Sequence, residues 1–466
     1  MAGDPSDTPR EAPSALLTDL YQLTMLQAYW REGMTEEAVF SLHFRELPPR
    51  RNYMLACGLS DALAFLEALR FRDEELRFLA TLGLFRDDFL EWLGDFRFTG
   101  SVRALPEGTP VFPLEPILEV EGPLPEAQLA ETVVMNQVHL QTVLASKAAR
   151  VVAAARGRAV VDFGLRRMHG TDAGLKAARA FHVAGVAATS NVLAGRVYGV
   201  PVTGTMAHSY IQAHDDEMEA FRAFAALYPG TVLLVDTYDT LEGVRKVVRL
   251  ARELGGDLRV RGVRLDSGDL AALAVETRRI LDEAGLGEVQ ILASGGLDED
   301  RVDRLLAAGA PLDGFGVGTS MGVSSDAPSL DIAYKLTAYA GAGRLKLSPG
   351  KELLPGRKQV FRVEEDGRAV RDVIGLAGEE AGGRPLLVSV MERGRRLDAA
   401  REPLADARER AREETLRLPE RLRALDPADP PYPVEVSRAL RRHQEDVRGR
   451  VTEGPGADRG PRPSGS

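Results

Sequence analysis

The sequence predicts an α/β fold, in which an irregular, TIM-like parallel (β/α) barrel is combined with an α+β domain built from N- and C-terminal segments. From residue 159 to residue 320, short strand-like segments alternate with helical ones, and this pattern is typical of a parallel sheet with crossover helices. Seven such strand segments follow one another, and this number favours closure into a barrel over an open sheet. Helical and extended pieces mix without this alternation before residue 123.

The region before the barrel contains helical patterns at 60–70 and 73–83, and extended patterns at 38–44 and 116–122. A long alanine-rich stretch without proline, 126–155, predicts a helix. We expect an N-terminal α+β domain at 15–125, the barrel with the active site at 126–327, and a C-terminal segment at 328–450 that packs with the N-terminal domain. The ends, 1–14 and 451–466, lack hydrophobic periodicity and are predicted to be disordered tails.

Within the barrel, the predicted strands are 159–163, 186–190, 201–205, 231–237, 259–267, 289–296 and 314–320. Helical periodicity fills the connections at 170–185, 191–199, 209–227, 240–254, 269–285 and 297–310. After residue 327 the alternation stops, and a loop plus strand is expected at 346–363. The arginine-rich helix expected at 405–425 carries charges of both signs, which indicate a solvated helix face.

Composition excludes several classes of protein. The net charge of −10 argues against nucleic acid or an anionic membrane as the main partner. The single cysteine, Cys57, rules out an intrachain disulfide and favours a reducing compartment; we interpret it as a small buried hydrophobic residue. No apolar run is long enough to span a bilayer, and the polar N-terminus lacks the apolar core of a secretory signal. The sequence therefore predicts a cytoplasmic protein.

Polar and glycine residues follow every predicted strand. In a parallel barrel these positions converge on one face, where ligands bind. Glycine, serine and aspartate are also ordinary turn and N-cap residues, but a histidine and arginines at the same end favour a ligand site. The candidate residues are Phe163, Arg166, Ser190, Thr205, His208, Asp236, Arg264, Asp266, Asp269, Gly295, Gly296, Gly318 and Thr319.

The chemistry of these residues points to a phosphorylated substrate. The glycine-rich loops at 294–296 and 316–319 can present backbone N–H groups to a phosphate. The carboxylates of Asp236 and Asp269, with Asp239 and Asp266, can hold Mg²⁺ or ribose hydroxyls. Arginine side chains suit a second anionic group. Phosphoribosyl pyrophosphate, as its Mg²⁺ complex, combines all of these groups.

Several motifs resemble those of the nicotinate phosphoribosyltransferase family, in order along the chain. They are TDLYQLTM (18–25), DFGLRRMHG (162–170), ATSNVLAG (188–195), GTMAHS (204–209), VDTYDT (235–240), VRLDSGD (263–269), SGGLDE (294–299), GVGTS (316–320) and KLSPGKELLPGRKQVFR (346–362). The resemblance covers about residues 16–362.

The resemblance implies an ATP-assisted, Mg²⁺-dependent reaction of nicotinate with phosphoribosyl pyrophosphate. It implies that ATP phosphorylates His208, and that Arg166 and Asp266 are the other catalytic residues. The nicotinate ring is expected between Phe163 and Tyr21 of a neighbouring subunit, in a homodimer with shared sites. The resemblance places Arg264, Asp266 and the two glycine-rich loops at the ribose phosphate. Ser190 and Thr205 are further expected substrate-binding residues.

Alternatives remain at this point. His169 is the rival to His208 as the phosphorylated residue, and Thr205 or Ser209 is expected to orient the His208 ring. Many relatives have glutamate at the position of Asp162. The relative that uses nicotinamide has an acidic residue after the second strand, where Ser190 and the following asparagine are neutral. A barrel isomerase or aldolase usually needs a lysine or a carboxylate base in the barrel, and no lysine ends a predicted strand. A non-catalytic binding protein is the last alternative.

Overall fold

The computed structural model describes residues 14–255, 260–347 and 353–453. They form two compact units. The described part of unit 1 is 141–255, 260–328 and 424–426, and that of unit 2 is 14–140, 329–347, 353–423 and 427–453. The division falls within helix α6 (Glu131–Ala154). The predicted disordered tails lie almost entirely outside the described residues. Among the described residues, no helix is long and apolar enough to cross a membrane.

Unit 1 is built on a parallel sheet. The described residues form six strands in the order β7-β6-β11-β10-β9-β8, and every neighbouring pair is parallel. The strands are β6 (Ala159–Asp162), β7 (Ala188–Thr189), β8 (Thr231–Leu234), β9 (Val260–Leu265), β10 (Gln290–Ala293) and β11 (Gly314–Val317). The prediction of a parallel α/β unit is confirmed.

The third predicted strand, 201–205, is reduced to one residue. Val202 makes an isolated parallel bridge to Thr189, and Pro201, which has no N–H group to donate, precedes it. Among the described residues, the backbone ladder ends at Val202 on one side and at β8 on the other. We call this gap the open edge. The backbone hydrogen bonds of this parallel sheet therefore form a partial barrel, which they do not close at the open edge.

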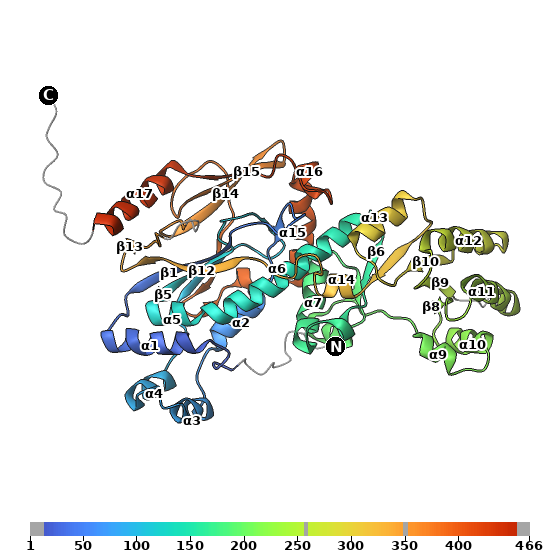
Figure 1. Cartoon of the computed structure of the whole chain (residues 1–466), viewed down its shortest axis with the longest axis horizontal. Coiled ribbons are helices and arrows are strands. Elements are labelled where there is room, and N and C mark those ends of the chain that lie inside the picture. The colour runs from blue at the N-terminus through green and yellow to red at the C-terminus, as the bar shows by residue number, and fades with distance from the viewer. Residues whose placement is uncertain (1–13, 256–259, 348–352, 454–466) are drawn as a thin grey trace. The chain divides into compact units, whose positions relative to one another are not determined.

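Helices connect the strands of unit 1 as the periodicity predicts. The helix predicted over 209–227 is interrupted, because Asp216 begins a second helix by accepting a hydrogen bond from Met218 N–H at 3.1 Å. Figure 1 shows α10, α11 and α12 beside β8 and β9. The helices are α7 (Thr171–Val183), α8 (Val192–Tyr198), α9 (His208–Gln212), α10 (Glu217–Leu227), α11 (Thr240–Leu254), α12 (Leu270–Glu283), α13 (Glu299–Ala307) and α14 (Thr319–Gly322), with the 3₁₀ turn η2 (Leu165–Arg167).

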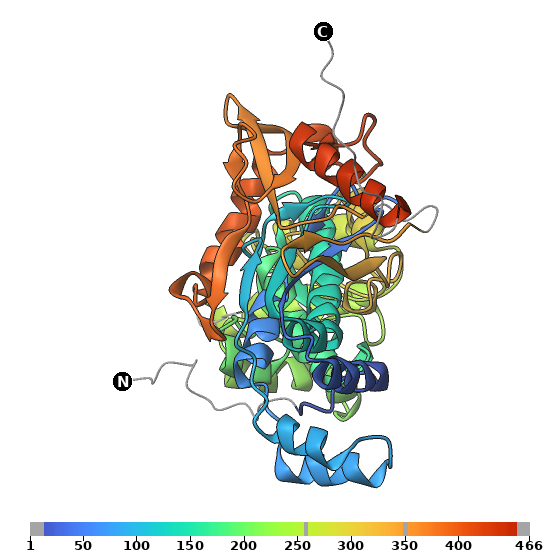
Figure 2. The same cartoon turned by 90° about the vertical axis from the view of Figure 1, so that its left-hand side faces the viewer.

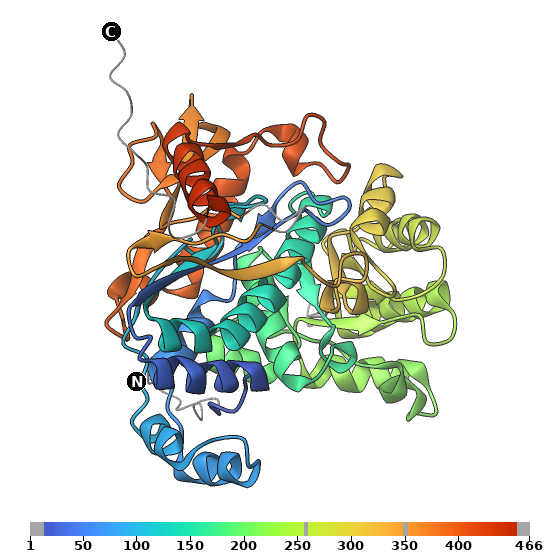
Figure 3. The same cartoon turned by 60° about the vertical axis from the view of Figure 1, so that its left-hand side comes forward.

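Unit 2 combines N- and C-terminal strands in one sheet. Its described residues form a seven-stranded sheet of order β13-β12-β1-β5-β3-β17-β18. Figure 3 shows β1 beside β12, although they are far apart in sequence, and they pair antiparallel from Ala38↔Tyr339 to Phe44↔Ile332. The strands are β1 (Glu37–Phe44), β3 (Ser101–Ala104), β5 (Leu118–Pro123), β12 (Ile332–Tyr339), β13 (Ala342–Gly343), β17 (Val388–Glu392) and β18 (Arg395–Arg396).

A second sheet of unit 2 has the order β16-β14-β15-β19. Ile374 of β15 and Leu440 of α17 share a buried cluster, and Figure 2 shows this helix, in red, beside the sheet. The elements are β14 (Lys358–Glu365), β15 (Arg368–Leu376), β16 (Arg384–Pro385), β19 (Val434–Val436) and α17 (Arg438–Glu453). The described residues also form the pair β2 (Met54–Leu55) and β4 (Pro110–Val111).

The described residues of unit 2 form further helices. They are α1 (Leu20–Glu32), α2 (Leu59–Ala68), α3 (Asp73–Thr81), α4 (Asp87–Gly94), α5 (Leu124–Leu129), α15 (Leu404–Arg417) and α16 (Glu420–Arg423), with the 3₁₀ turn η4 (Asp398–Ala400). Helix α15 is largely exposed, as its mixed charges predict, but Glu414 points inward and is buried.

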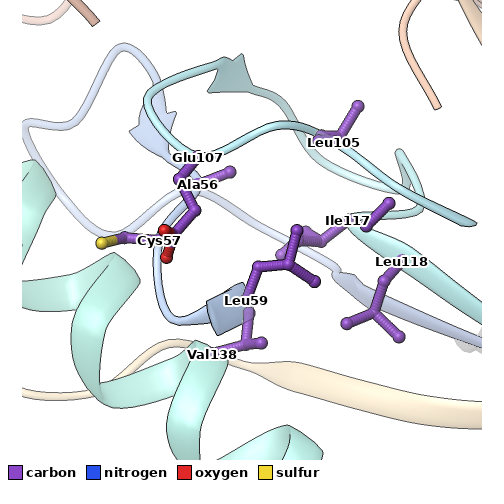
Figure 4. A pocket seen from close by; sticks show the side chains of 9 residues that line it. Ala56, Cys57, Leu59, Leu105, Glu107, Ile117, Leu118 and Val138 are labelled. Atoms are coloured by element: carbon purple, nitrogen blue, oxygen red, sulfur yellow. The ribbon is translucent and has the colours of Figure 1, made fainter. Parts of the chain in front are cut away.

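Cys57 lies against a small, mainly apolar pocket of unit 2 (Figure 4). The cysteine is buried, and its neighbours in the pocket include Leu59, Ile117 and Val138. The one carboxylate among the lining residues, that of Glu107, accepts a hydrogen bond from Gly58 N–H at 2.6 Å. This environment agrees with the interpretation of Cys57 as a packing residue.

Candidate active site

Asp162 fixes the turn at the end of β6. Its side chain is buried; Oδ1 accepts a hydrogen bond from Gly164 N–H at 2.8 Å, and Oδ2 accepts one from the Thr189 hydroxyl at 2.7 Å. Burial raises the pKa of Asp162, while these two hydrogen bonds act to lower it. The shorter side chain at this position therefore has a structural task, which is to hold the loop that carries Phe163.

The Phe163 ring lies where a glycine leaves room for it. A Cβ atom on Gly316 would come within 2.5 Å of the ring, so a side chain at that position would collide with Phe163. The Phe163 N–H donates to Val317 O at 2.9 Å. The guanidinium carbon of Arg264 lies 5.7 Å from the ring centroid, a separation typical of a cation–π contact.

Two arginines provide positive charge at this end of the sheet. Arg264, on β9, donates from Nη2 to Met206 O at 3.1 Å, and its buried Nε has no hydrogen-bond partner. Burial lowers the pKa of Arg264, Asp266 and Asp236 act to raise it, and Arg166 lowers it further. Arg166 itself is exposed on η2. The pair leaves guanidinium N–H groups available to an anion.

His208 begins helix α9 and is held by a hydroxyl. Its Nδ1 lies 3.1 Å from Thr237 Oγ1, and its Nε2 lies 3.8 Å from Asp266 Oδ2. The side chains of His208 and Asp266 are 41% and 35% exposed, so a ligand can reach both. The prediction that Thr205 or Ser209 orients the ring is wrong: Thr205 Oγ1 bonds instead to Met206 O at 3.3 Å. The partner comes from the end of β8, on the other side of the open edge.

The two aspartates after β8 and β9 are linked. Asp236 Oδ2 accepts hydrogen bonds from Asp266 N–H at 2.9 Å and from Ser267 Oγ at 2.7 Å. Its buried Oδ1 has no partner. The Ser294 hydroxyl donates to Asp266 Oδ1. The structure thus joins the ends of three adjacent strands through Asp266 and leaves one carboxylate oxygen of Asp236 open.

Glycine is required in the loop after β10. Gly295 and Gly296 have φ angles of +85° and +60°, which favour glycine. A Cβ atom on Gly295 would also lie 1.8 Å from Asp266 O. In the loop after β11, Gly318 precedes α14, and Thr319 is exposed. The two predicted phosphate loops therefore leave neighbouring strands at the same end of the sheet.

Asp269 lies at the start of helix α12, and its predicted metal role stays a prediction. Its Oδ1 accepts hydrogen bonds from Ala271 N–H and Ala272 N–H, both at 3.2 Å, and so caps helix α12. In the part of the chain that the structure describes, no group of three or more His, Cys, Asp or Glu side chains is placed to hold a metal. A cation at this site would need ligands from a substrate.

Comparison with known proteins identifies the family to which this chain belongs. The NAPRTase N-terminal domain family matches residues 16–139, and the NAPRTase family matches residues 158–351. The chain is 58% identical to the nicotinate phosphoribosyltransferase pncB2 of Mycobacterium tuberculosis over 92% of each chain. It is 42% identical to the nicotinate phosphoribosyltransferase of Bacillus subtilis, over 78% of this chain and 77% of the other. The chain belongs to the nicotinate phosphoribosyltransferase family. The crystal structure of human nicotinic acid phosphoribosyltransferase matches with a TM-score of 0.81 and 31% identity, over 93% of this chain and 99% of the human one.

Other predicted residues of this nicotinate phosphoribosyltransferase family member lie as follows. Ser190 follows β7 and donates its N–H to Asp162 O at 2.9 Å. The adjacent Asn191 is buried, and its Oδ1 caps α8. His169 is exposed after η2. Tyr21 lies on α1 of unit 2 and is 48% exposed; its place in a shared site stays a prediction.

Several groups at the site of this family member were not among the predicted site residues. Thr237, Ser294 and the Met206 carbonyl all bond to predicted site residues. Thr237 ends one predicted strand and Ser294 lies near the end of another, so their position was a signal. Glycine and charge drew attention to other residues of the same loops, and the partner of a given side chain depends on the neighbouring strand, which local sequence does not name.

Proposed function

We propose that this protein catalyses the reaction of nicotinate with phosphoribosyl pyrophosphate to give nicotinate mononucleotide and diphosphate, coupled to ATP hydrolysis in the cytoplasm. One observation carries the proposal: His208, Asp266, Arg264 and the glycine-rich loops converge at the strand ends of a chain from this family. We further propose that unit 1 is an irregular TIM-like barrel, with side chains joining the open edge. The His208–Thr237 hydrogen bond supports this closure.

In the proposed reaction, the pyridine nitrogen attacks the anomeric carbon as the bond to the diphosphate oxygen breaks. The diphosphate leaves with the bonding electron pair, and positive charge develops on the ribose. Arg166 and Arg264 bind anionic groups of the substrates, and Phe163 provides an aromatic face for the pyridine ring. The Asp266 carboxylate stabilises the positive charge that develops on the ribose. The loops after β10 and β11 bind the 5′-phosphate through backbone N–H groups.

The residues present fit a Mg²⁺ ion that arrives with the diphosphate. Asp236 Oδ1 is buried without a partner, and Mg²⁺ commonly combines one or two carboxylates with substrate phosphates and water. When bound, Mg²⁺ offsets the charge of the leaving diphosphate. Asp269 is not carried into this proposal, because it caps α12.

We assign the phosphorylation by ATP to His208. The Thr237 hydroxyl can accept from Nδ1–H in the tautomer whose Nε2 carries the lone pair, and the proposed reaction uses that tautomer. A bond forms between Nε2 and the γ-phosphorus, and the bond to the bridging oxygen of ADP breaks. Hydrolysis of the phosphohistidine later returns the free imidazole and phosphate.

A screen of pyridine bases tests the function. With phosphoribosyl pyrophosphate and ATP, diphosphate release is expected with nicotinate and far less with nicotinamide. His208→Ala is expected to lose nicotinate-dependent ATP hydrolysis and keep slow, ATP-independent synthesis at high substrate concentration. If this variant still acquires acid-labile, base-stable phosphate from γ-labelled ATP, the phosphorylated residue is not His208. His169→Ala belongs in the same assay.

We also propose a homodimer in which Tyr21 of one subunit completes the site of the other. Its exposed ring on α1 supports this proposal. Mixing Tyr21→Ala protein with Arg166→Ala protein under subunit exchange is expected to restore part of the activity, because one hybrid site carries neither substitution. No recovery in mixtures that demonstrably exchange subunits contradicts a shared site.

A further inference from the structure

Helix α6 carries a lysine that is almost fully buried in unit 1. The Lys147 side chain is 2% exposed, and its Nζ contacts Glu299 Oε2 and, at 2.7 Å, Asp326 Oδ1. Glu299 is equally buried, and its other oxygen accepts a hydrogen bond from Arg150 Nε at 2.9 Å. Removing a buried charge from its partner is strongly unfavourable, so these contacts fix the lysine in one place.

The two carboxylates occupy related positions in the chain. Glu299 is the first residue of α13, just behind the loop of Gly295 and Gly296. Asp326 lies beyond the end of α14, the short helix that begins at Thr319, directly after Gly318. The strands before these loops, β10 and β11, are parallel neighbours. One ammonium group therefore joins the chain behind both glycine-rich loops.

Further hydrogen bonds connect helix α13, which begins with Glu299, to the loop of Gly295 and Gly296. Arg301, on α13, donates from Nη1 to Gly295 O at 3.2 Å, and Asp298 caps the same helix by accepting from Arg301 N–H at 2.8 Å. Burial acts to raise the pKa of Glu299, but Lys147 and Arg150 outweigh it and lower the pKa below its ordinary value. Glu299 is thus an ionised partner at neutral pH, and the anchor is electrostatic.

We propose that Lys147 is a positioning residue that sets the spacing of the two loops for the phosphate of phosphoribosyl pyrophosphate. The inference rests on the proposed function, because it takes both loops to bind that phosphate. Lys147 touches no substrate in this scheme; it acts through Glu299 and Asp326. Small displacements of binding groups lower activity by up to about 100-fold, so a loosened pair of loops weakens phosphate binding selectively.

The test compares steady-state constants for the two substrates. Lys147→Met is expected to raise KM for phosphoribosyl pyrophosphate by about tenfold to 100-fold, with KM for nicotinate changed less than about threefold. Asp326→Asn, at a part-exposed side chain, releases the second loop alone and is expected to give a smaller rise. This variant keeps the test available if Lys147→Met does not fold. Lys147→Arg, which keeps a charge between the carboxylates, is expected to recover part of the loss.

Lys246→Met is the matched control. Lys246 binds the buried Glu217 at 2.8 Å within unit 1 but joins helices α10 and α11, which carry neither loop. Its variant is expected to lower the unfolding midpoint without changing either KM more than about twofold. The double variant Lys147→Met with Glu299→Gln removes the charges of both residues, so it can recover part of the unfolding midpoint that Lys147→Met loses. The proposal requires that KM for phosphoribosyl pyrophosphate stays high in this double variant even if the midpoint recovers. Recovery of KM together with stability overturns the positioning role, as does an equal rise of both KM values.

The wild-type reaction separates this inference from the proposed function. If the wild-type protein releases no diphosphate from nicotinate and phosphoribosyl pyrophosphate, the proposed function is wrong. If it does, but every folded Lys147 and Asp326 variant leaves KM for phosphoribosyl pyrophosphate unchanged, the function stands and the positioning role is overturned.

Discussion

The charged cluster around Arg362 in unit 2 and the charged groups at the strand ends of unit 1 are arranged in opposite ways. In unit 2, the fully buried Arg362 binds both oxygens of Asp372 at 3.0 and 2.7 Å, and also Glu414 at 3.3 Å. At the strand ends of unit 1, by contrast, Asp236 Oδ1 and Arg264 Nε have no partner, and His208 faces solvent. Charges that satisfy one another stabilise a fold, whereas charges that the backbone holds but leaves incompletely bonded are available to a ligand.

The largest expected effect comes from breaking the satisfied cluster. Arg362→Met leaves Asp372 and Glu414 buried without their cation, and we expect a loss of about 3–5 kcal/mol in the free energy of unfolding. Denaturant unfolding followed by circular dichroism measures it. Arg384→Met is the control, because Arg384 binds the same Glu414 at 2.8 Å from a half-exposed position; exposed pairs contribute at most about 1 kcal/mol. If the two variants lose equal free energy of unfolding, the Arg362 cluster is not the stabilising arrangement described here.

Changing an incompletely bonded charge at the strand ends of unit 1 is expected to affect activity rather than stability. Asp236→Asn keeps an oxygen for the Asp266 N–H but loses the charge, and we expect kcat/KM for phosphoribosyl pyrophosphate to fall about 100-fold, as for other lost electrostatic contacts. The free energy of unfolding is expected to change by less than about 1 kcal/mol. Kinetics over a Mg²⁺ series measure the first effect. Asp269→Asn is the comparison, because asparagine also caps helices; a similar loss of activity there restores the predicted metal role of Asp269.

A smaller effect is expected from adding charge beside the base. Ser190→Asp places a carboxylate after β7, where it repels the carboxylate of nicotinate and can accept from the amide of nicotinamide. We expect the ratio of kcat/KM for nicotinate over nicotinamide to fall about tenfold, which corresponds to about 1.4 kcal/mol. Ser190→Asn, which adds similar volume without charge, is the control. If the ratio is unchanged in Ser190→Asp, the pyridine base does not bind beside Ser190.

The smallest effect comes from a carboxyl group that is buried beside the Arg362 cluster. Burial and then the neighbouring Asp372 carboxylate raise the pKa of Glu115 well above its ordinary value. A raised pKa means that the folded state holds a proton that the unfolded state releases. Stability from this group is therefore full below the unfolded pKa of about 4.3 and is lost as pH rises through the folded pKa.

Glu115→Gln removes that dependence. The amide cannot ionise and can still accept the hydrogen bond that Phe112 N–H now donates to Glu115 at 2.9 Å. We expect the variant to gain on the wild type in free energy of unfolding as pH rises, by about 1.4 kcal/mol for each pH unit between the unfolded and the folded pKa of Glu115. Unfolding curves from pH 5 to 8 measure the trend, and a constant difference between the two proteins contradicts it.

Local sequence was sufficient for most of unit 1 because its neighbouring strands, apart from β6 and β11, follow one another through helical connections. The alternation from Ala159 to Val317 predicts the parallel sheet, and its strand ends predict most of the polar groups that the structure brings together. The exception is Val202, because pairing of an edge segment depends on the neighbour across from it as well as on its own residues.

The fold of unit 2 was less predictable because its paired strands lie far apart in the sequence. Strand β1 pairs with β12, and β3 pairs with β17, across most of the chain length. No local pattern names such distant partners. The same limit applies within the site, where the ring of His208 is held by Thr237 rather than by the adjacent Thr205 or Ser209. Local patterns predict which residues reach the strand ends but not which of them meet.

The open edge between Val202 and β8 has a consequence for exchange with solvent. The chain that leads from Val202 to His208 is joined to the neighbouring strand ends by the Thr237 and Arg264 side chains, whose hydrogen bonds each contribute about 1 kcal/mol. Segments held this way open locally without unfolding the sheet. Amide protons at 204–208 are therefore expected to exchange for deuterium sooner than those of β9 and β10, and to slow when phosphoribosyl pyrophosphate binds. His208 then lies on a segment that opens more readily than the strands beside it.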